Sequence, residues 1–227
     1  EMIPIAQVFS RYGGIGLQTS MCPECDFIYK TRNLSSAWYD EHFRKNWLSG
    51  DHERESNVQL KSVPFVNLKK YIGSDKKVLD VGCGLGDRLL AFQAAGHAVF
   101  GCEPSLRRSN IASEKLRTKI ENTTGEQFFR TLGGNEYFDV VTFFTVLAFV
   151  ERPFSLLKQA VDHLNENGII YIRDGNFLFH NIFQSTHLGV MRSFISKKSI
   201  FKFAEYNNLE VLKYVDSPCE FYLRKTE

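Results

Sequence analysis

Val78-Leu79-Asp80-Val81-Gly82-Cys83-Gly84-Leu85-Gly86-Asp87 is the stretch on which the fold of this chain depends. An apolar, β-branched run leads into an acid and then into three glycines at alternate positions. Residues 88–95 have the composition of a helix, so the sequence predicts a strand, a tight turn and a helix. Glycine suits such a turn because a Cβ would either forbid its dihedral angles or hold a ligand away from the backbone. The pattern therefore predicts a ligand close to the backbone at a helix N-terminus.

From Lys77 onward, expected strands alternate with expected helices, which indicates an α/β fold with a mostly parallel sheet covered on both faces. The expected strands are 77–82, 98–103, 118–122, 138–144, 168–174, 209–215 and 219–223. The expected helices are 87–95 (stopped by Gly96 at its C-cap), 105–116, 125–132, 153–164 and 196–206. Only Asp216-Ser217-Pro218 joins the last two strands, and so short a link permits only an antiparallel pair.

The composition is that of an ordinary globular domain. Of the 227 residues, 43% are hydrophobic and 24% are charged, and the net charge is +2. A charge this small gives no reason to expect a nucleic acid or a membrane surface as a partner. The longest apolar run, 140–150, is far shorter than the ~20 residues that a membrane helix needs, and no signal peptide is visible. We therefore expect a cytoplasmic protein.

Residues 1–60 are expected to form an N-terminal extension, and residues 61–227 the main domain. Residues 1–35 are predicted to be irregular or short-stranded, and Ser35 or Ser36 can cap a helix after them. Trp38, Tyr39, Phe43 and Trp47 share one face of that helix. Four aromatic rings on one face favour packing onto the main domain. The alternative is a lid over the ligand, with Tyr39 or Phe43 facing it.

Cys22-Pro23-Glu24-Cys25 supplies two thiolates at the spacing found in half of a zinc ribbon. The other cysteines fall at positions 83, 102 and 219, and neither His42 nor His52 has a partner at ligand spacing. We therefore expect no zinc in this chain and favour a partial knuckle. A redox pair is expected still less, because no helix N-terminus is evident to lower the pKa of the first thiol.

The spacing of the glycines distinguishes between two classes of cofactor. The dinucleotide fingerprint Gly-x-Gly-x-x-Gly would place its third glycine at position 87, where Asp87 would repel a pyrophosphate. Alternate glycines preceded by Asp80 suit a ligand that carries an ammonium group and no phosphate. Glu103, at the end of the next expected strand, can accept from both ribose hydroxyls of an adenosine. S-adenosylmethionine has both groups, so we expect it as the cofactor.

Residues 77–225 resemble a class I S-adenosylmethionine-dependent methyltransferase. Val78 to Gly86 stands as the family's first motif, Glu103 matches its ribose-binding acid, and Phe138-Asp139-Val140-Val141 matches the motif of its fourth strand. The resemblance implies a Rossmann-like three-layer sandwich with a seven-stranded sheet in the order 3-2-1-4-5-7-6, strand 7 being antiparallel. Residues 20–45 are similar to the segment that precedes such domains in a subgroup that modifies sugars and other small metabolites. In that subgroup a zinc ribbon with two Cys-x-x-Cys pairs precedes a Tyr-rich helix, and only the second pair stands here.

A sheet of this kind binds its ligand outside the carboxyl ends of the strands. The expected cofactor-binding residues are Asp80, Gly82, Cys83, Gly84, Gly86, Glu103, Pro104, Glu121, Asn122, Phe144, Thr145 and Tyr39. Asp174, Asn176, His180 and His187 follow the strand 168–174, where the acceptor would approach. His180 or His187 is the expected catalytic base, because an imidazole near its unperturbed pKa can deprotonate a hydroxyl; the alternative is two exposed loop histidines. Arg173 and Arg192 could hold an anionic acceptor, or lie solvated at the surface.

One run departs from the family. After the fourth strand, relatives often carry Leu-Glu-His, whereas this chain has Leu147-Ala148-Phe149. If that histidine is the base in relatives, this chain uses another residue, needs none or methylates poorly.

The expected function is direct in-line transfer of a methyl group to a small-molecule acceptor, a sugar or a natural-product-like metabolite. Two alternatives are an RNA or protein methyltransferase and a catalytically inactive relative that binds the cofactor. No Asn/Asp-Pro-Pro-aromatic tetrad follows the strand 138–144, which counts against the amino groups of nucleic-acid bases as acceptors. The oligomeric state is not predicted by the sequence.

Overall fold

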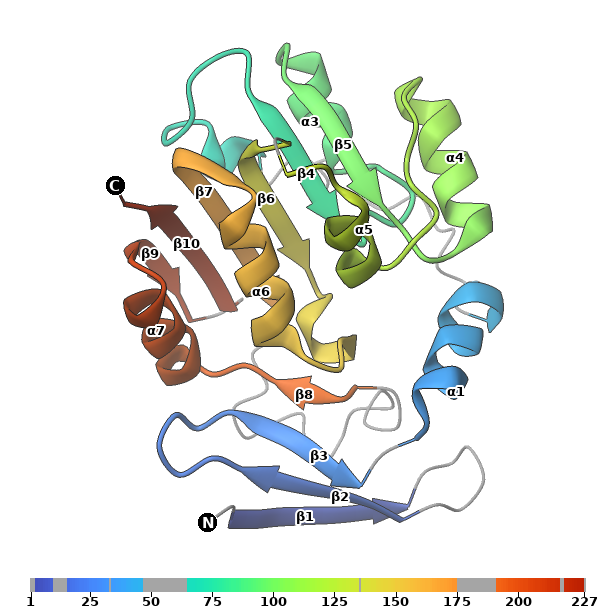
Figure 1. The fold of residues 1–227 in the computed structure, drawn as a ribbon, viewed down its shortest axis with the longest axis vertical. Coiled ribbons are helices and arrows are strands. Elements are labelled where there is room, and N and C mark those ends of the chain that lie inside the picture. The colour runs from blue at the N-terminus through green and yellow to red at the C-terminus, as the bar shows by residue number, and fades with distance from the viewer. Residues whose placement is uncertain are drawn as a thin grey trace.

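The computed structural model describes residues 3–9, 16–32, 34–46, 65–134, 136–174, 191–216 and 219–226 (Figure 1). The strands of its larger sheet are β4 (Lys77–Val81), β5 (Ala98–Cys102), β6 (Phe138–Phe144), β7 (Leu164–Asp174), β9 (Leu209–Val215) and β10 (Cys219–Lys225). Their order in space is β5-β4-β6-β7-β10-β9. Neighbours from β5 to β7 pair in parallel, and β10 is antiparallel to both β7 and β9. The Rossmann-like α/β fold with a terminal antiparallel hairpin is thus confirmed.

The expected strand at 118–122 is not formed, so the expectation of seven strands was wrong by one. A single parallel bridge joins Glu121 to Cys102 beside β5, at the place that the expected order gives to the third strand. The Glu103 N–H donates to the Glu121 carbonyl at 2.9 Å, and the Thr123 N–H donates to the same carbonyl at 3.0 Å. Because the chain turns at once after Glu121, no second ladder residue follows.

Helices cover the larger sheet on both faces. They are α3 (Leu89–Ala94), α4 (Leu106–Leu116), α5 (Gly125–Thr131), α6 (Pro153–Asp162) and α7 (Lys197–Tyr206). Leu79, Val141 and Ile170 belong to a core cluster that includes side chains of α5, α6 and α7. Val78, Val140 and Ile169, the preceding residues of the same strands, belong to a cluster with α3, α4 and the helical turn at 65–68. This alternation gives the three layers.

The ends of the first helix differ from the expectation. Helix α3 begins at Leu89, two residues late, since the turn continues through Arg88. It ends at Ala94 with Ala95 as its C-cap, and Gly96 follows with φ +88°. Gly96 was expected as the C-cap but is the residue after it. It has the left-handed conformation that a glycine adopts without strain.

The smaller sheet joins the N-terminal part of the chain to residues 193 and 194. It contains β1 (Ile3–Phe9), β2 (Gly16–Met21), β3 (Ile28–Arg32) and the two-residue strand β8 (Ser193–Phe194), in the order β1-β2-β3-β8. Ile28 pairs with Phe194 and Tyr29 pairs with Ser193. Figure 1 shows this sheet beyond the carboxyl ends of β4, β5 and β6. The N-terminal extension therefore lies over the edge where a ligand was expected.

Helix α1 (Ser36–Glu41) follows β3 and continues as a π-helical turn, His42–Asn46. Ser35 is its N-cap, as expected, and accepts from the Trp38 N–H at 3.2 Å. Trp47 lies outside the described residues. No helix among the described residues is both long and apolar enough to cross a membrane.

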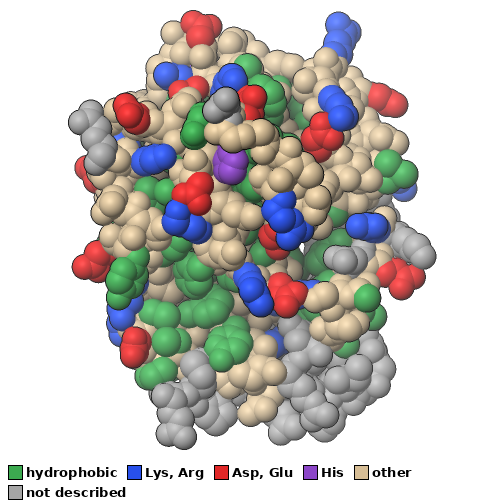
Figure 2. Space-filling view, viewed as in Figure 1, with side chains coloured by type: hydrophobic (Ala, Val, Ile, Leu, Met, Phe, Trp, Pro, Cys, Tyr) green, Lys and Arg blue, Asp and Glu red, His purple; other side chains and the backbone are tan. Residues whose placement is uncertain are grey.

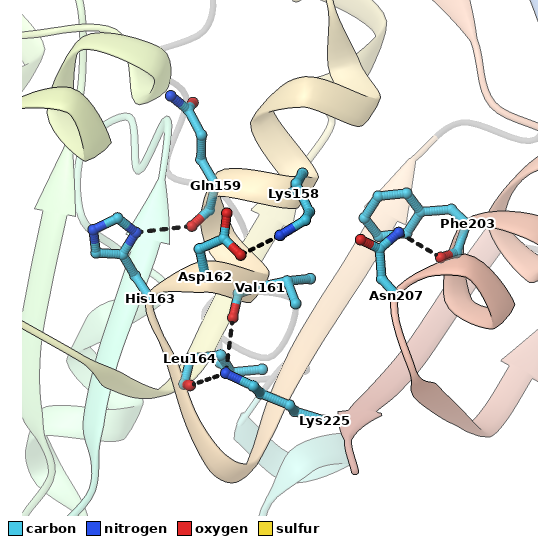
Figure 3. A network of polar contacts seen from close by, with 9 residues as sticks. All are labelled: Lys158, Gln159, Val161, Asp162, His163, Leu164, Phe203, Asn207 and Lys225. Carbon is cyan, nitrogen blue, oxygen red and sulfur yellow. Dashed lines mark hydrogen bonds and ion pairs between the residues drawn. The ribbon is translucent and has the colours of Figure 1, made fainter. Parts of the chain in front are cut away.

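Side chains cap the ends of α6 and α7 (Figure 3). Lys225, near the end of β10, donates from Nζ to the carbonyls of Val161 at 3.2 Å and Leu164 at 2.9 Å. Val161 lies in the last turn of α6, where a cation complements the helix dipole, and Leu164 is the first residue of β7. In the same way, Asn207 Nδ2 donates to the Phe203 carbonyl at 2.8 Å at the end of α7.

Candidate functional site

A cavity of about 1100 Å³ lies between the carboxyl ends of the parallel strands and α1. The loop after β4 contributes Gly82 and Gly84, the end of β5 contributes Glu103, and the end of β6 contributes Phe144 and Thr145. These strand ends are where an open α/β sheet binds its ligand. The volume is slightly above the usual range for small-molecule sites, about 300–1,000 Å³.

The three glycines of the loop serve different purposes. All have positive φ, +69° at Gly82, +58° at Gly84 and +73° at Gly86. A Cβ on Gly84 would meet nothing within 4 Å, whereas one on Gly82 would approach Val146 Cγ2 to 2.7 Å and one on Gly86 would approach Leu116 Cδ1 to 2.9 Å. Gly86 thus allows α4 to pack closely, and Gly84 presents bare backbone to open space.

Asp80 lies directly before this loop and is 1% exposed. Its Oδ1 accepts from the Thr142 hydroxyl at 2.7 Å, while Oδ2 has no hydrogen-bond partner among the described residues. Burial raises the pKa of Asp80 to about 6, against the opposing effects of the Arg88 cation and the Thr142 hydrogen bond. A buried acceptor without a donor is costly, and a positively charged ligand near the loop would offset part of that cost.

Glu103 holds the next position along the cavity wall. Its Oε2 accepts from the Gly84 N–H and its Oε1 from the Ser105 N–H, both at 3.0 Å. Burial raises the pKa of Glu103, against the effects of the Ser105 N–H and the Arg108 cation. A carboxylate oxygen has more than one acceptor site. Both oxygens can therefore also accept from a ligand with two adjacent hydroxyls.

Several expected cofactor residues do not line the cavity: Asp80, Cys83, Gly86, Glu121 and Asn122. Cys83 is buried, and a Cβ on Gly101 would lie 3.0 Å from its Sγ. Asn122 Nδ2 donates to the carbonyls of Glu103 at 3.1 Å and Pro104 at 3.0 Å. Glu121 pairs with Lys119 and accepts from the Glu103 N–H through its carbonyl. Glu121 and Asn122 thus support Glu103 and Pro104, which do line the cavity.

Several lining residues were not expected from the sequence, and two groups of them lie next to the expected site. Arg88 lines the cavity and places its guanidinium 4.4 Å from the centre of the Phe144 ring. A cation at the start of a helix is disfavoured by the helix dipole. The position of Arg88 at the start of α3 could therefore have indicated a functional role. Thr123, Thr124 and Gly125 also line the cavity, just after the weakly patterned segment 118–122.

Thr145, which directly follows β6, has a strained backbone. Its φ is +53°, uncommon for a β-branched residue, and its N–H donates to the Arg173 carbonyl at 2.8 Å. Such strain persists where the surroundings fix it, and it is found preferentially at functional sites. Thr145 and Phe144 both line the cavity, and their contact with the cofactor stays a prediction.

Aromatic residues form the wall opposite the glycine loop. Tyr39 of α1 is 2% exposed, yet it lines the cavity together with Phe43. Phe43 contacts Phe149 with ring centres 5.5 Å apart, and the Arg192 guanidinium lies 3.8 Å from the centre of the Tyr39 ring. Tyr39 is therefore both packed and part of the wall, which combines the two expectations for α1.

One carboxylate oxygen ties α1 to the rest of this wall. Glu151 Oε2 accepts from the Ser36 hydroxyl at 2.7 Å and from Arg192 Nη1 at 3.1 Å. These contacts, with the Ser36 hydrogen bond the largest, lower the pKa of Glu151. The carboxylate thus stays ionised in a position that joins three segments distant in sequence.

The expected acceptor side is described only in part. His180, His187 and Asn176 lie outside the described residues. Of the neighbouring candidates, Arg192 lines the cavity, whereas Asp174 and Arg173 do not, and Arg173 pairs with Glu220 at 3.5 Å.

No histidine is among the described residues that line the cavity. At the position where relatives often carry one, Phe149 contributes an aromatic ring to the wall, next to the buried Ala148.

The Cys-x-x-Cys pair lies in the turn between β2 and β3. The Cys22 N–H donates to the Phe27 carbonyl at 2.8 Å, and the Asp26 N–H donates to the Cys22 carbonyl at 2.9 Å. The N–H groups of Glu24 and Cys25 lower the pKa of Cys22, while burial raises that of Cys25. Within the described part of the chain, no group of three His, Cys, Asp or Glu side chains converges as metal ligands.

The family model described as "Methyltransferase domain" matches residues 52–214. The chain belongs to this family. Ubiquinone biosynthesis O-methyltransferases are similar in sequence to this methyltransferase domain. That of Glaesserella parasuis is 25% identical over 152 residues, 64% of this chain and 61% of the relative. That of Pasteurella multocida is 32% identical over 154 residues, 63% of this chain and 61% of the relative. The methyltransferase domain thus spans about three fifths of the length of these relatives.

Solved structures support the fold of the methyltransferase domain. A methyltransferase dependent on S-adenosylmethionine from Archaeoglobus fulgidus has a TM-score of 0.63 at 15% identity and covers 83% of this chain and 99% of its own. The amino pentose methyltransferase of calicheamicin biosynthesis from Micromonospora echinaspora, solved with S-adenosylmethionine bound, has a TM-score of 0.60 at 16% identity. It covers 76% of this chain and 93% of its own. At these identities the likeness concerns the fold.

Proposed function

We propose that this chain transfers a methyl group from S-adenosylmethionine to a small-molecule acceptor. One observation carries the proposal: Gly84 leaves open space at the backbone directly beside the Glu103 carboxylate, which accepts from the Gly84 N–H. A bare backbone next to a carboxylate that can accept from a diol matches an adenosine. The relatives are named as O-methyltransferases, and a solved neighbour is an amino pentose methyltransferase, which supports a small-molecule acceptor.

The residues present fit the cofactor. Glu103 would hold the ribose hydroxyls, and Gly82 and Gly84 would leave room for the ligand at the backbone. Asp80 does not line the cavity, and its buried carboxylate would act on the ammonium group of the ligand through its charge. The open backbone of Gly84 beside the Glu103 carboxylate is the test of this fit, since together they offer a diol both space and acceptors. Arg88 lines the cavity beside the same loop and would offset a ligand carboxylate.

Bound S-adenosylmethionine supplies an electrophilic methyl group. The chain's part is to align the acceptor in line with that group and to exclude water. Tyr39, Phe43 and Phe149 provide an aromatic wall for this purpose. His180 and His187 stay our candidates for a base that removes a proton from an acceptor hydroxyl.

The distribution of charge favours a small acceptor over a nucleic acid. On the face drawn in Figure 2, Lys and Arg side chains alternate with Asp and Glu side chains and form no continuous basic band among the described residues. A nucleic-acid enzyme needs such a band to bind phosphates.

Phe149 favours one second candidate, a relative that binds the cofactor without catalysis. An aromatic ring at that wall position cannot accept a proton. If the segment that holds His180 and His187 does not provide a base, only acceptors that need no deprotonation would be methylated.

Calorimetry with S-adenosylmethionine, S-adenosylhomocysteine and NAD tests the proposal. We expect both sulfur ligands to bind and Glu103→Ala to weaken them at least about tenfold, since a charge-assisted hydrogen bond contributes ~1.5–3 kcal/mol. Glu166→Ala, an exposed carboxylate in β7, is the matched control and should leave the affinity unchanged. Binding of NAD alone, or full affinity in Glu103→Ala, would contradict the assignment.

A further inference from the structure

A second cavity, of about 320 Å³, adjoins the first one. Ser36, Glu151 and Arg192 line both cavities. The hydrogen bonds from Ser36 and Arg192 to the single oxygen Glu151 Oε2 therefore form the partition between them. The volume is at the lower end of the range for small-molecule sites, enough for one end of a ligand.

Two buried cations line this second cavity. Lys30 is 6% exposed and Arg192 is 8% exposed. Glu151 is the one acidic side chain among the described residues that line it, and that side chain is 60% exposed. Among the described residues, two cations and one carboxylate therefore line the second cavity, with the cations in its drier part and the carboxylate in its wetter part.

Arg192 is fixed in place and keeps a donor available. The backbone N–H of Arg192 donates to the Ala148 carbonyl at 2.6 Å, and the backbone carbonyl of Arg192 accepts from the backbone N–H of Lys30 at 2.9 Å. Nη1 binds Glu151, while Nε is buried and has no hydrogen-bond partner among the described residues. A rigid guanidinium with a spare N–H is a typical recognition group for a carboxylate or a phosphate.

The charge of Lys30 also responds to what lies beside it. Burial, together with the nearby Arg192 cation, lowers the pKa of Lys30 to about 8. A bound anion would oppose both effects and favour the ammonium form.

We infer that the second cavity binds an anionic end, a carboxylate or a phosphate, of the methyl acceptor, whose reacting end passes Ser36 and Glu151 into the larger cavity. This inference rests on the proposed function for the reaction, but the anion site itself does not depend on it. It assigns Lys30 and Arg192 to acceptor recognition and predicts that neutral acceptors bind less well than their anionic counterparts.

The first test measures how fast an amine-acylating reagent modifies Lys30, read by mass spectrometry on the whole chain with and without S-adenosylhomocysteine. Two matched pairs serve as probes: 4-hydroxybenzoate with its neutral methyl ester, and glucose 6-phosphate with glucose. At ten times its Kd, an anion that fills the cavity should slow the modification about tenfold, because the free fraction falls by that factor. Lys158, an exposed side chain of α6, is the internal control.

The pairs separate the sources of the anion. Protection by 4-hydroxybenzoate alone assigns carboxylate acceptors, and protection by glucose 6-phosphate alone assigns phosphorylated ones. Equal protection by charged and neutral partners, no protection by any probe, or equal protection of Lys158 would overturn the inference.

A second test uses the variant Lys30→Met, with Lys158→Met as its matched control. The affinity for the protecting anion should fall about tenfold in Lys30→Met alone, while S-adenosylhomocysteine affinity, which also reports a folded chain, stays the same. If anions protect Lys30 in a chain that binds no S-adenosylhomocysteine, the result would support the anion site and contradict the proposed function. The reverse result, cofactor binding without an effect of anions, would sink only the anion site.

Discussion

Asp80 shows how a single residue couples the site to stability. Its folded-state pKa of about 6 lies above the unfolded value near 3.9, a difference that corresponds to roughly 3 kcal/mol. For an acid with a raised pKa, the folded state binds the proton more tightly. The contribution of Asp80 to the free energy of unfolding is therefore fully present below about pH 4, and it is lost as the pH rises through about 6.

We therefore predict that Asp80→Asn raises the free energy of unfolding at pH 7 by about 1–2 kcal/mol, because it removes a buried charge and introduces a buried amide. The gain should shrink as the pH falls from about 6 to about 4. Urea unfolding across this pH range measures it, with Asp162→Asn, an exposed residue of α6, as the control. The same variant should bind S-adenosylmethionine more weakly. A variant with unchanged stability at pH 7 would show that Asp80 is not ionised in the free protein.

At the level of single residues, the sequence indicated which positions lie at or near the site, but not the structural role of each residue. Three alternate glycines looked equivalent, but Gly84 faces open space while Gly82 and Gly86 make room for Val146 and Leu116. Val146 lies just after β6 and Leu116 belongs to α4, and spacing along the sequence alone does not reveal either contact. Arg192 was found as one of two possible anion-binding arginines, and its stacking on Tyr39 depends on a tertiary contact.

At the scale of elements, Lys225 links the last strand to the helix α6. We predict that Lys225→Met lowers the free energy of unfolding by about 1–2 kcal/mol, since two carbonyls near the end of α6 lose a charged donor. Urea unfolding measures the loss, and Lys225→Arg should restore part of it. Lys119→Met, at an exposed surface lysine, is the control and should have little effect. A loss of S-adenosylhomocysteine affinity would contradict a purely structural role.

Strong local patterns made some elements predictable. Strands β6 and β9 have the bounds expected from sequence, because a continuous apolar run marks a strand covered on both faces and turn residues bound the hairpin. Strand β7 begins at Leu164, four residues before the expected start. The polar residues Asn165-Glu166-Asn167 gave no sign of a strand there, and the register of β7 against β6 shifts in this region.

Other elements could not be predicted because partners distant in sequence create them. The two residues of β8 have no periodicity, and they become a strand only by pairing with β3. The sheet β1-β2-β3-β8 therefore exceeded the expectation of irregular or short-stranded chain at 1–35.

At the scale of the whole molecule, α1 forms part of the wall of the larger cavity, and β3 and β8 of the smaller sheet line the second cavity. The N-terminal extension should therefore unfold together with the larger sheet. The two tryptophans, Trp38 and Trp47, both belong to residues 1–60. Their fluorescence therefore reports the extension, whereas circular dichroism reports the whole chain.

We predict coincident thermal transitions by the two probes. S-adenosylhomocysteine at 100 times its Kd should add about 2.7 kcal/mol of stability and raise both midpoints by about 5–10 °C. An early fluorescence transition that the ligand does not shift would show that the extension melts independently and does not contact the cofactor. NAD at the same concentration is the control and should shift neither midpoint.

The strand β8 also has a consequence for the order in which the chain can fold during synthesis. Strands β1 to β3 leave the ribosome first, but the partner of β3 follows much later, and the bond from the Ser196 hydroxyl to the Cys25 carbonyl spans 171 positions. Until then the outer edge of β3 exposes unpaired backbone groups, which invite pairing with another nascent chain. A polypeptide that stops before residue 191 would keep that edge open, so premature termination should yield aggregates and no soluble half-protein.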